Sequence, residues 1–221
     1  MTATVRAILF DLDGTLVDSA PDLAGAANAL RSVRGLPALP YAVLRPLVGT
    51  GARGMVGAAM GVGPSDSRFE TLRDEFLALY AERLLSETAL FPQMADLLEV
   101  LKQRRVVWGI VTNKAARFAE PLVKGLGLDL QAAVLICGDT TPFAKPHPEP
   151  LLEAARRLAC PVEHCVYVGD DLRDIDAGRA AGMRTMAAGW GYLGDGPAID
   201  EWKADWTINS PAELLNCLKL A

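Results

Sequence analysis

Short apolar runs alternate with amphipathic stretches along most of the chain. A nearly uninterrupted apolar run is typical of a strand covered on both faces, whereas apolar residues at helical spacing indicate a helix with one buried side. The apolar runs predict strands over residues 5–10, 106–111, 134–137, 165–168, 184–187 and 206–208. The amphipathic stretches predict helices over residues 94–104, 115–126, 149–159, 172–181 and 211–218. This alternation predicts an α/β fold with a doubly wound parallel sheet, whose ligands bind at the carboxyl ends of the strands.

One interval, between residues 17 and 88, shows helical patterns and no convincing strand. Helices are expected there after two capping boxes, Ser19 with Asp22 and Ser67 with Glu70. Their apolar sides would carry Leu23, Ala27, Leu30 and Val33 in the first helix and Phe69, Leu72, Phe76 and Leu79 in the second. A glycine-rich piece, residues 49–54, lies between them. The pattern therefore predicts a small helical domain, residues 17–89, inserted into a core formed by residues 1–16 and 90–221.

The composition fits a globular protein with a buried core, because 51% of the 221 residues are hydrophobic and 22% are charged. Lys and Arg number 22 against 27 Asp and Glu, for a formal net charge of −5. Nucleic-acid binding needs a basic face, so we expect no nucleic-acid partner. No segment approaches the roughly 20 apolar residues that span a bilayer, and the apolar N-terminal run is too short for a signal peptide. We therefore expect a cytoplasmic protein without a membrane partner.

The cysteines do not predict a metal site. The four are Cys137, Cys160, Cys165 and Cys217. No two of them form a CxxC pair, and only two histidines are available to complete a zinc site. We expect free thiols, with Cys137 and Cys165 in the core because both lie in apolar runs.

Candidate chemistry begins where the first predicted strand ends, in the sequence FDLDGTLVDS from residue 10 to residue 19. Asp11 and Asp13 follow the strand, and Gly14 allows a sharp turn there. A carboxylate is ionised at neutral pH and can attack phosphorus without a base to activate it. A second acid two residues away can protonate the leaving oxygen and later deprotonate water. A lone DxD would more often be a solvated strand end, but the longer pattern favours a nucleophile, Asp11, beside a general acid/base, Asp13.

A second acidic cluster, GDDLRDID, follows the predicted strand over residues 165–168. Asp170 comes directly after a glycine at the strand end, and Asp174 lies one helical turn further on. Alone, these acids could simply favour the start of a helix. Together with Asp11 and Asp13 they form an oxygen-rich set that repels an incoming phosphate and needs a cation, for which Mg²⁺ is suited. The sequence therefore predicts a magnesium site that includes Asp170.

Two further segments fit a phosphate site. Thr112, in the sequence VTNK, ends a strand before a helix and offers a hydroxyl and free backbone N–H groups, although such a threonine is usually only an N-cap. Lys145 lies in the proline-rich loop FAKPHP and could hold phosphate and nucleophile together, although a surface lysine is the usual alternative.

Taken together, the motifs DLDGT, VTN, Lys145 before a proline, and GDDLRD make the chain resemble the haloacid dehalogenase-like (HAD) hydrolase superfamily from end to end. The resemblance implies a Rossmann-like core, with the helical insert as the small cap that closes over the substrate. It implies that Asp11 is the nucleophile, that Asp13 is the general acid/base and that Lys145 stabilises the negative charge in the site. Thr112 and Asn113 would contact the phosphoryl group. Mg²⁺ would be held by Asp11, the backbone carbonyl of Asp13, and Asp170, with Asp174 and Asp171 behind them.

Within this superfamily the opening DLDGTLVDSAPDLAGAANA and the later LVGTGAR resemble bacterial phosphoglycolate phosphatases. Three features depart from that pattern. Asp171 replaces the usual serine, and Gln93 stands where a glycine commonly follows Phe/Tyr-Pro. The tail from Gly189 to Pro211 looks more like the N-acetylmuramic acid 6-phosphate phosphatases of cell-wall recycling.

The resemblance implies a phosphatase that acts on a small phosphate monoester, with 2-phosphoglycolate as the leading candidate. N-acetylmuramic acid 6-phosphate is the alternative substrate, and a β-phosphoglucomutase-like isomerase is an alternative of another class, since it shares all four motifs. A dehalogenase would lack the second acid that Asp13 provides, and a binding protein without activity would show damaged motifs. Arg53, in the glycine-rich piece, is a candidate substrate contact. A monomer and a homodimer both remain open.

Overall fold

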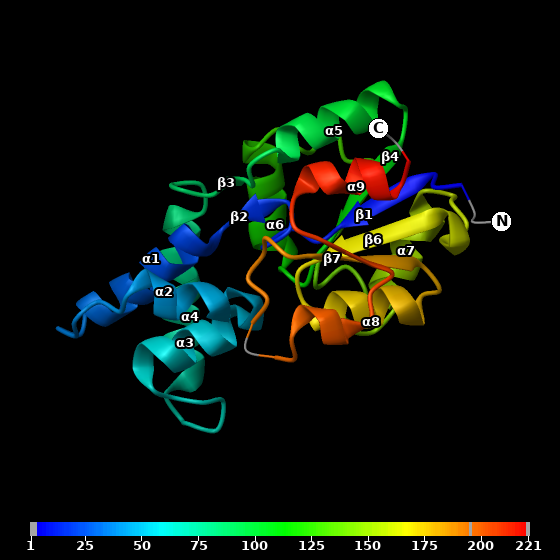
Figure 1. Cartoon of the computed structure of the whole chain (residues 1–221). Coiled ribbons are helices and arrows are strands. Elements are labelled where there is room, and N and C mark those ends of the chain that lie inside the picture. The colour runs from blue at the N-terminus through cyan, green and yellow to red at the C-terminus, as the bar shows by residue number, and fades with distance from the viewer. Residues whose placement is uncertain (1–3, 195, 220–221) are drawn as a thin grey trace.

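A parallel six-stranded sheet forms the centre of the molecule in the computed structural model, which describes residues 4–194 and 196–219 (Figure 1). Its strands are β1 (Ala7–Phe10), β4 (Val107–Val111), β5 (Leu135–Ile136), β6 (Cys165–Gly169), β7 (Arg184–Ala188) and β8 (Trp206–Ile208). They lie in the order β5-β4-β1-β6-β7-β8, and every neighbouring pair is parallel. The doubly wound parallel sheet predicted from the sequence is therefore confirmed, and β1 lies at its centre.

Helices cover both faces of this sheet (Figure 1). On one face lie α5 (Met94–Gln103), α6 (Ala116–Gly125) and α9 (Pro211–Cys217), which pack against Ile8 and Phe10 of β1. On the other face α7 (Glu149–Arg157) and α8 (Leu172–Ala180) pack in the cluster that contains Ala7 and Leu9. Alternate residues of β1 thus face opposite apolar layers, which is why the whole strand reads as one apolar run.

Four helices follow β1 and lie together beside the sheet (Figure 1). They are α1 (Ala20–Ser32), α2 (Tyr41–Leu44), α3 (Gly51–Met60) and α4 (Phe69–Arg83), with a 3₁₀ segment, η1 (Arg45–Thr50), before α3. We call them the helical insert. Two short strands, β2 (Val17–Asp18) and β3 (Ala89–Leu90), pair antiparallel at the two ends of this segment. A strand at Val17 was not expected, and the division into two domains at residues 17 and 89 stays a prediction.

The two predicted capping boxes are wrong. Ser19 precedes α1, but its side chain makes no capping bond and instead donates to Asp13. Asp22 accepts hydrogen bonds from the backbone N–H groups of Glu87 and Thr88. The second helix begins at Phe69 after Arg68, with no side-chain cap. In the first case tertiary partners take the groups that a local cap would use, and sequence spacing does not show them.

Three smaller features complete the fold. All four cysteines are free, and Cys137 and Cys165 are buried as expected. Among the described residues, no helix has both the length and the apolar character that crossing a membrane requires. Two further 3₁₀ segments, η2 (Val162–His164) and η3 (Ile199–Trp202), precede β6 and β8.

Candidate active site

Three of the residues predicted to act on phosphate or to bind metal lie at one edge of the sheet, where three neighbouring parallel strands end. Asp11 follows β1, Thr112 follows β4, and Asp170 follows β6. All three line a cavity of about 390 Å³, whose other wall includes Leu23 of α1 together with Phe76 and Tyr80 of α4. The site therefore lies between the carboxyl ends of the strands and the helical insert, as the rule for open α/β sheets predicts.

Three carboxylates crowd together at this edge. An oxygen atom from each of Asp11, Asp170 and Asp174 lies within 4.8 Å of the others. Lys145 lies between two of them, with its Nζ 2.9 Å from Asp11 Oδ1 and 2.7 Å from Asp174 Oδ1. The lysine side chain is almost fully buried, and its Nζ also donates to the hydroxyl of Tyr167 at 2.7 Å. One buried ammonium group thus lies within a cluster of three carboxylates and contacts two of them.

Asp170 is fixed tightly by its surroundings. Its two oxygens accept hydrogen bonds from the Thr15 hydroxyl and the Tyr192 backbone N–H, both at 2.8 Å. Gly14, at φ +86°, comes so close that a Cβ atom there would lie 2.1 Å from Asp170 Oδ2. A Cβ at Gly191 would likewise lie 2.1 Å from Asp170 Cβ. Only glycine fits at either position, so the backbone packs against this carboxylate on two sides.

Burial and neighbouring charges shift the pKa values of the groups in this cluster. Burial raises the pKa of Asp11 to about 7; Lys145 opposes this shift, and Asp174 adds to it. Burial and the charges of Asp11 and Asp174 raise the pKa of Asp170 well above its usual value. For Lys145, burial alone would lower the pKa, but its two carboxylate partners raise it. A divalent cation among the three carboxylates would relieve this repulsion, and their all-oxygen donor set fits Mg²⁺.

Asp13 points away from this cluster, toward the insert. Its Oδ1 accepts a hydrogen bond from the Ser19 hydroxyl at 2.5 Å, and Lys114 Nζ lies 3.0 Å and 3.1 Å from its two oxygens. Lys114 is buried, and its Nζ lies 4.7 Å from the centre of the Tyr80 ring. Burial alone would lower the pKa of Lys114, but the charge of Asp13 raises it. This carboxylate is therefore held on the cavity wall beside Asp11, where an acid/base residue would act.

Lys114 was missed by sequence reasoning. It stands in the VTNK motif, but a lysine just before a helix carries no signal that it will reach Asp13, 101 residues away in sequence. Thr15, Tyr167 and Tyr192 were missed for the same reason, because each is bonded to a site residue at least 22 residues away in the sequence. Ser19 was interpreted as a helix cap, but its hydroxyl donates to Asp13, six residues away.

Thr112 and Asn113 both line the cavity of Asp11, but their side chains make different contacts. Thr112 is buried, and its hydroxyl accepts the backbone N–H of Lys114 at 3.1 Å, which is the local role expected of a strand-end threonine. Asn113 uses its side-chain amide on the backbone of Lys145: its oxygen accepts the Lys145 N–H and its nitrogen donates to the Lys145 carbonyl, both at 2.9 Å. Asn113 therefore fixes the loop that carries Lys145. Its contact with a phosphoryl group stays a prediction.

Asp171 starts helix α8. Its Oδ1 accepts the backbone N–H of Arg173 at 2.9 Å, while Asp174 Oδ2 accepts the N–H of Asp171 at 3.1 Å, so the two acids form a capping box. Arg173 also pairs with Asp171 at 2.7 Å and donates to the carbonyl of Gly49 in the insert. The acid that replaces serine here thus anchors an arginine that links core and insert.

Arg53 does not line the cavity that contains Asp11. It is exposed on α3 and lines a neighbouring cavity of about 620 Å³ together with Leu193 and Trp202. Its neighbours Gly51 and Ala52 do line the cavity of Asp11. The glycine-rich piece therefore reaches the site through its backbone and its alanine, and the structure does not place the arginine there.

The arrangement can perform phosphoryl transfer. Asp11 Oδ1 accepts hydrogen bonds from Lys145 and from the backbone N–H of Leu12, whereas Oδ2 has no hydrogen-bond partner among the described residues. One oxygen is thus fixed and the other is free to attack. Asp13, on the next outward-facing position of the same segment, can exchange a proton with the leaving oxygen. Asp11, Asp170 and the backbone of Asp13 could hold a metal ion.

Comparison with known proteins agrees with this geometry. A family model described as haloacid dehalogenase-like hydrolase matches residues 5–182. A phosphoglycolate phosphatase from Xanthomonas campestris is 48% identical over 210 residues, which cover 95% of this chain and 94% of that protein. An N-acetylmuramic acid 6-phosphate phosphatase from Pseudomonas putida is 43% identical over 210 residues, with the same coverage. The crystal structure of a predicted phosphoglycolate phosphatase from Haemophilus somnus superposes with a TM-score of 0.86 at 28% identity and covers 98% of this chain and 99% of that one.

Proposed function

The chain belongs to the haloacid dehalogenase-like hydrolase family, and we propose that it is a Mg²⁺-dependent phosphatase that works through a phosphorylated Asp11. The observation that carries the proposal is the arrangement of Asp11, Lys145, Asp170 and Asp174 within one buried cluster, with Asp13 beside it. A nucleophile, a fixed cation, metal ligands and an acid/base residue are the parts that phosphoryl transfer requires.

The reaction takes place in two steps. Asp11 Oδ2 attacks phosphorus, the bond from phosphorus to the ester oxygen breaks, and Asp13 gives a proton to that oxygen as the alcohol leaves. Asp13 then takes a proton from water as the water oxygen attacks the phosphorus of phospho-Asp11. The bond between phosphorus and Asp11 Oδ2 breaks, which releases inorganic phosphate and regenerates the Asp11 carboxylate. Lys145 holds the Asp11 carboxylate in line throughout, and Thr112 and Asn113 lie where they could meet phosphate oxygens. A bound Mg²⁺, held by Asp11, the Asp13 carbonyl and Asp170, would supply the positive charge that offsets repulsion between carboxylate and phosphate.

The substrate is a small phosphate monoester, and 2-phosphoglycolate is our first candidate because several similar proteins carry that activity in their names. N-acetylmuramic acid 6-phosphate is the second. A specific observation favours it: the cavity of about 390 Å³ has an apolar and aromatic wall formed by Leu23, Phe76, Tyr80 and Phe118. Such a wall has room for a sugar ring and its N-acetyl group, in the size range of sites for ligands larger than 2-phosphoglycolate. We take the enzyme to be a cytoplasmic monomer or homodimer without membrane or nucleic-acid partners.

A phosphate-release screen tests the proposal. The panel holds 2-phosphoglycolate, N-acetylmuramic acid 6-phosphate, hexose phosphates and nucleotides, each with Mg²⁺. We expect release from at least one of the first two, loss of release in EDTA, and recovery when Mg²⁺ is added back. Asp11→Asn should abolish release, whereas the matched control Asp129→Asn, at an exposed acid outside the cavity, should not.

Two outcomes would contradict the proposal. An Asp11→Asn variant with wild-type turnover would rule out Asp11 as the nucleophile. Isomerisation of glucose 1-phosphate without release of phosphate would favour the mutase alternative, in which a sugar hydroxyl takes the place of water.

A further inference from the structure

Four cationic side chains line the cavity of Asp11, and three of them are already neutralised. Lys145 pairs with Asp11 and Asp174, Lys114 pairs with Asp13, and Arg173 pairs with Asp171. The fourth, Arg117, has no carboxylate partner and no hydrogen bond among the described residues. An arginine at a cavity wall with unused donors is suited to bind an anionic group of a ligand.

Arg117 is held ready for such a contact. It lies in the first turn of α6, and its guanidinium carbon is 4.7 Å from the centre of the Phe118 ring. Stacking on a ring restrains the plane of the guanidinium and leaves the N–H groups at its edge available. The side chain is exposed, so a ligand in the cavity can reach it without displacing a protein partner.

A second unsatisfied group lies at the same wall. The hydroxyl of Tyr80, on α4 of the insert, is buried and has no hydrogen-bond partner among the described residues. Its ring centre is 5.5 Å from that of Phe118, the residue on which Arg117 stacks. A buried hydroxyl without a hydrogen-bond partner is unfavourable, so a hydrogen-bond acceptor on the ligand would stabilise the complex there. An unpaired guanidinium and an unpaired hydroxyl thus flank one aromatic ring.

We propose that Arg117 binds a carboxylate of the substrate, with the Phe118–Tyr80 wall beside it, and that this contact selects phosphate esters of carboxylic acids. The inference rests on the proposed function, since both candidate esters carry one carboxylate besides the phosphate. A single free guanidinium matches a single carboxylate in charge and in its paired donors. The phosphate itself reacts at Asp11, and Arg117 lines the same cavity.

The test compares paired substrates that differ only in the carboxylate-bearing part. 2-Phosphoglycolate is set against ethyl phosphate, and N-acetylmuramic acid 6-phosphate against N-acetylglucosamine 6-phosphate. We expect Arg117→Gln to lower kcat/KM for the carboxylate-bearing ester about ten- to a hundredfold, the usual range for a lost hydrogen bond to a charged group. The loss should come mainly from KM, because the carboxylate is bound equally in the ground and transition states. The carboxylate-free partner should be almost unaffected.

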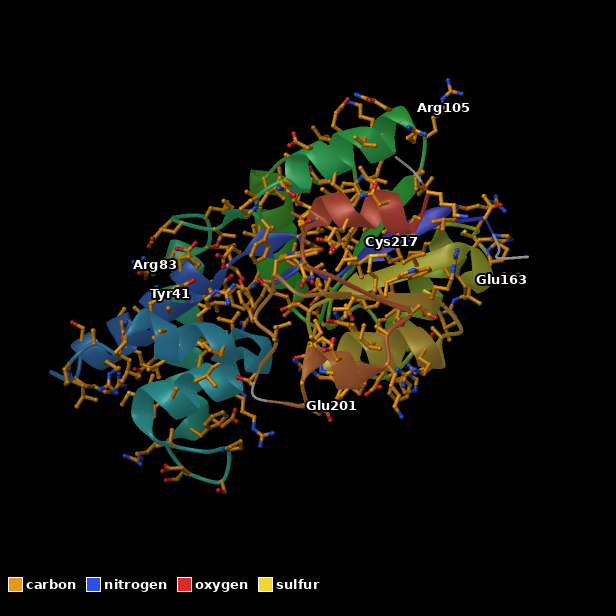
Figure 2. The ribbon with its side chains drawn as sticks, viewed as in Figure 1. Tyr41, Arg83, Arg105, Glu163, Glu201 and Cys217 are labelled. Atoms are coloured by element: carbon orange, nitrogen blue, oxygen red, sulfur yellow. The ribbon has the colours of Figure 1, made fainter. Side chains whose placement is uncertain are left out.

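Two control variants sharpen the result. Arg117→Lys keeps the charge but loses the paired donors, so it should restore only part of the preference. Arg105→Gln removes one positive charge from an exposed site after α5, on the side of the molecule away from the insert (Figure 2), and should leave both substrates unchanged. An equal loss for both members of a pair in Arg117→Gln would overturn the inference, as would no loss at all or a wild type that does not distinguish the members.

Binding to inactive protein separates this inference from the proposed function. In the Asp11→Asn background, calorimetry should show that 2-phosphoglycolate or N-acetylmuramic acid 6-phosphate binds more weakly once Arg117→Gln is added. If that dependence is seen but wild-type protein releases no phosphate from either ester, the proposed function fails and the carboxylate contact stands. If binding does not depend on Arg117, the inference fails whatever the turnover shows.

Discussion

Lys145 is fixed at two levels. Its Nζ lies between Asp11 and Asp174, and its backbone is held by the side chain of Asn113. Because a displacement of about 1 Å at a reacting centre can cost roughly a hundredfold in rate, the Asn113 amide matters even if it never touches the substrate. The structure therefore offers two roles for Asn113, a phosphate contact or the positioning of Lys145.

A double-mutant cycle separates these roles. We expect Asn113→Ala to lower kcat between about ten- and a hundredfold, because the loop that carries Lys145 loses two hydrogen bonds. In a Lys145→Met background the same substitution should cost little more, since residues that act as a unit give non-additive losses. The measurement is kcat for the ester that the wild type hydrolyses best. A loss of equal size in both backgrounds would show that Asn113 acts independently of Lys145.

The sequence predicts those site residues whose position depends on neighbouring residues in the chain. Asp11, Thr112 and Asp170 each directly follow an apolar run, so strand ends could be located and the residues assigned to one edge of the sheet. Lys114 and Tyr192 could not be found, because their partners Asp13 and Asp170 lie 101 and 22 residues away and depend on the path of the chain. A substrate contact by Arg53 stays a prediction: its place in a glycine-rich piece says nothing about the direction of its side chain, and the structure places it at the neighbouring cavity.

At the scale of elements, the predicted strands and helices of the core agree with the structure to within two residues at each end. Their buried apolar runs are strong local signals because both faces of the sheet are covered. The two-residue pair β2 and β3 was missed, since such short strands have no periodicity to detect. The capping boxes predicted at Ser19 and Ser67 were wrong. A true capping box exists at Asp171 and Asp174, two acids that the sequence analysis had placed behind the metal ligands.

The cap on α8 gives a prediction about stability. Asp171→Ala should lower the free energy of unfolding by about 1 kcal/mol, and by up to about 2 kcal/mol, because it removes the capping acceptor. Asp171→Ser should cost less, since serine is also a good N-cap, although it loses the partly exposed ion pair with Arg173. Urea unfolding in EDTA measures both variants without a contribution from metal. Equal losses would mean that the ion pair with Arg173, rather than the cap, stabilises this end of α8.

At the scale of the whole molecule, the cavity is closed by contacts between the core and the helical insert. Arg173 donates to the Gly49 carbonyl, Arg45 donates to the Gly191 carbonyl at 3.2 Å, and the Tyr192 hydroxyl accepts the Ser19 N–H at 2.8 Å. Tyr192 also donates its backbone N–H to Asp170, so one acid of the carboxylate cluster is bonded to a residue at which the two parts of the chain meet. Relief of the repulsion among the carboxylates should therefore stabilise the whole fold.

This coupling can be measured as a shift in melting temperature, independent of turnover. Mg²⁺ at about a hundred times its Kd should add roughly 2.7 kcal/mol of stability. For a chain of this size that amounts to about 5–10 °C. Asp170→Asn should lose this response, although the metal-free variant should be at least as stable as metal-free wild type because one of three crowded carboxylates becomes neutral. NaCl at equal ionic strength serves as the control for general screening. A Mg²⁺-induced shift of the same size in Asp170→Asn would show that the ion binds elsewhere, and a metal-free variant that melts well below wild type would show that Asp170 stabilises the fold rather than straining it.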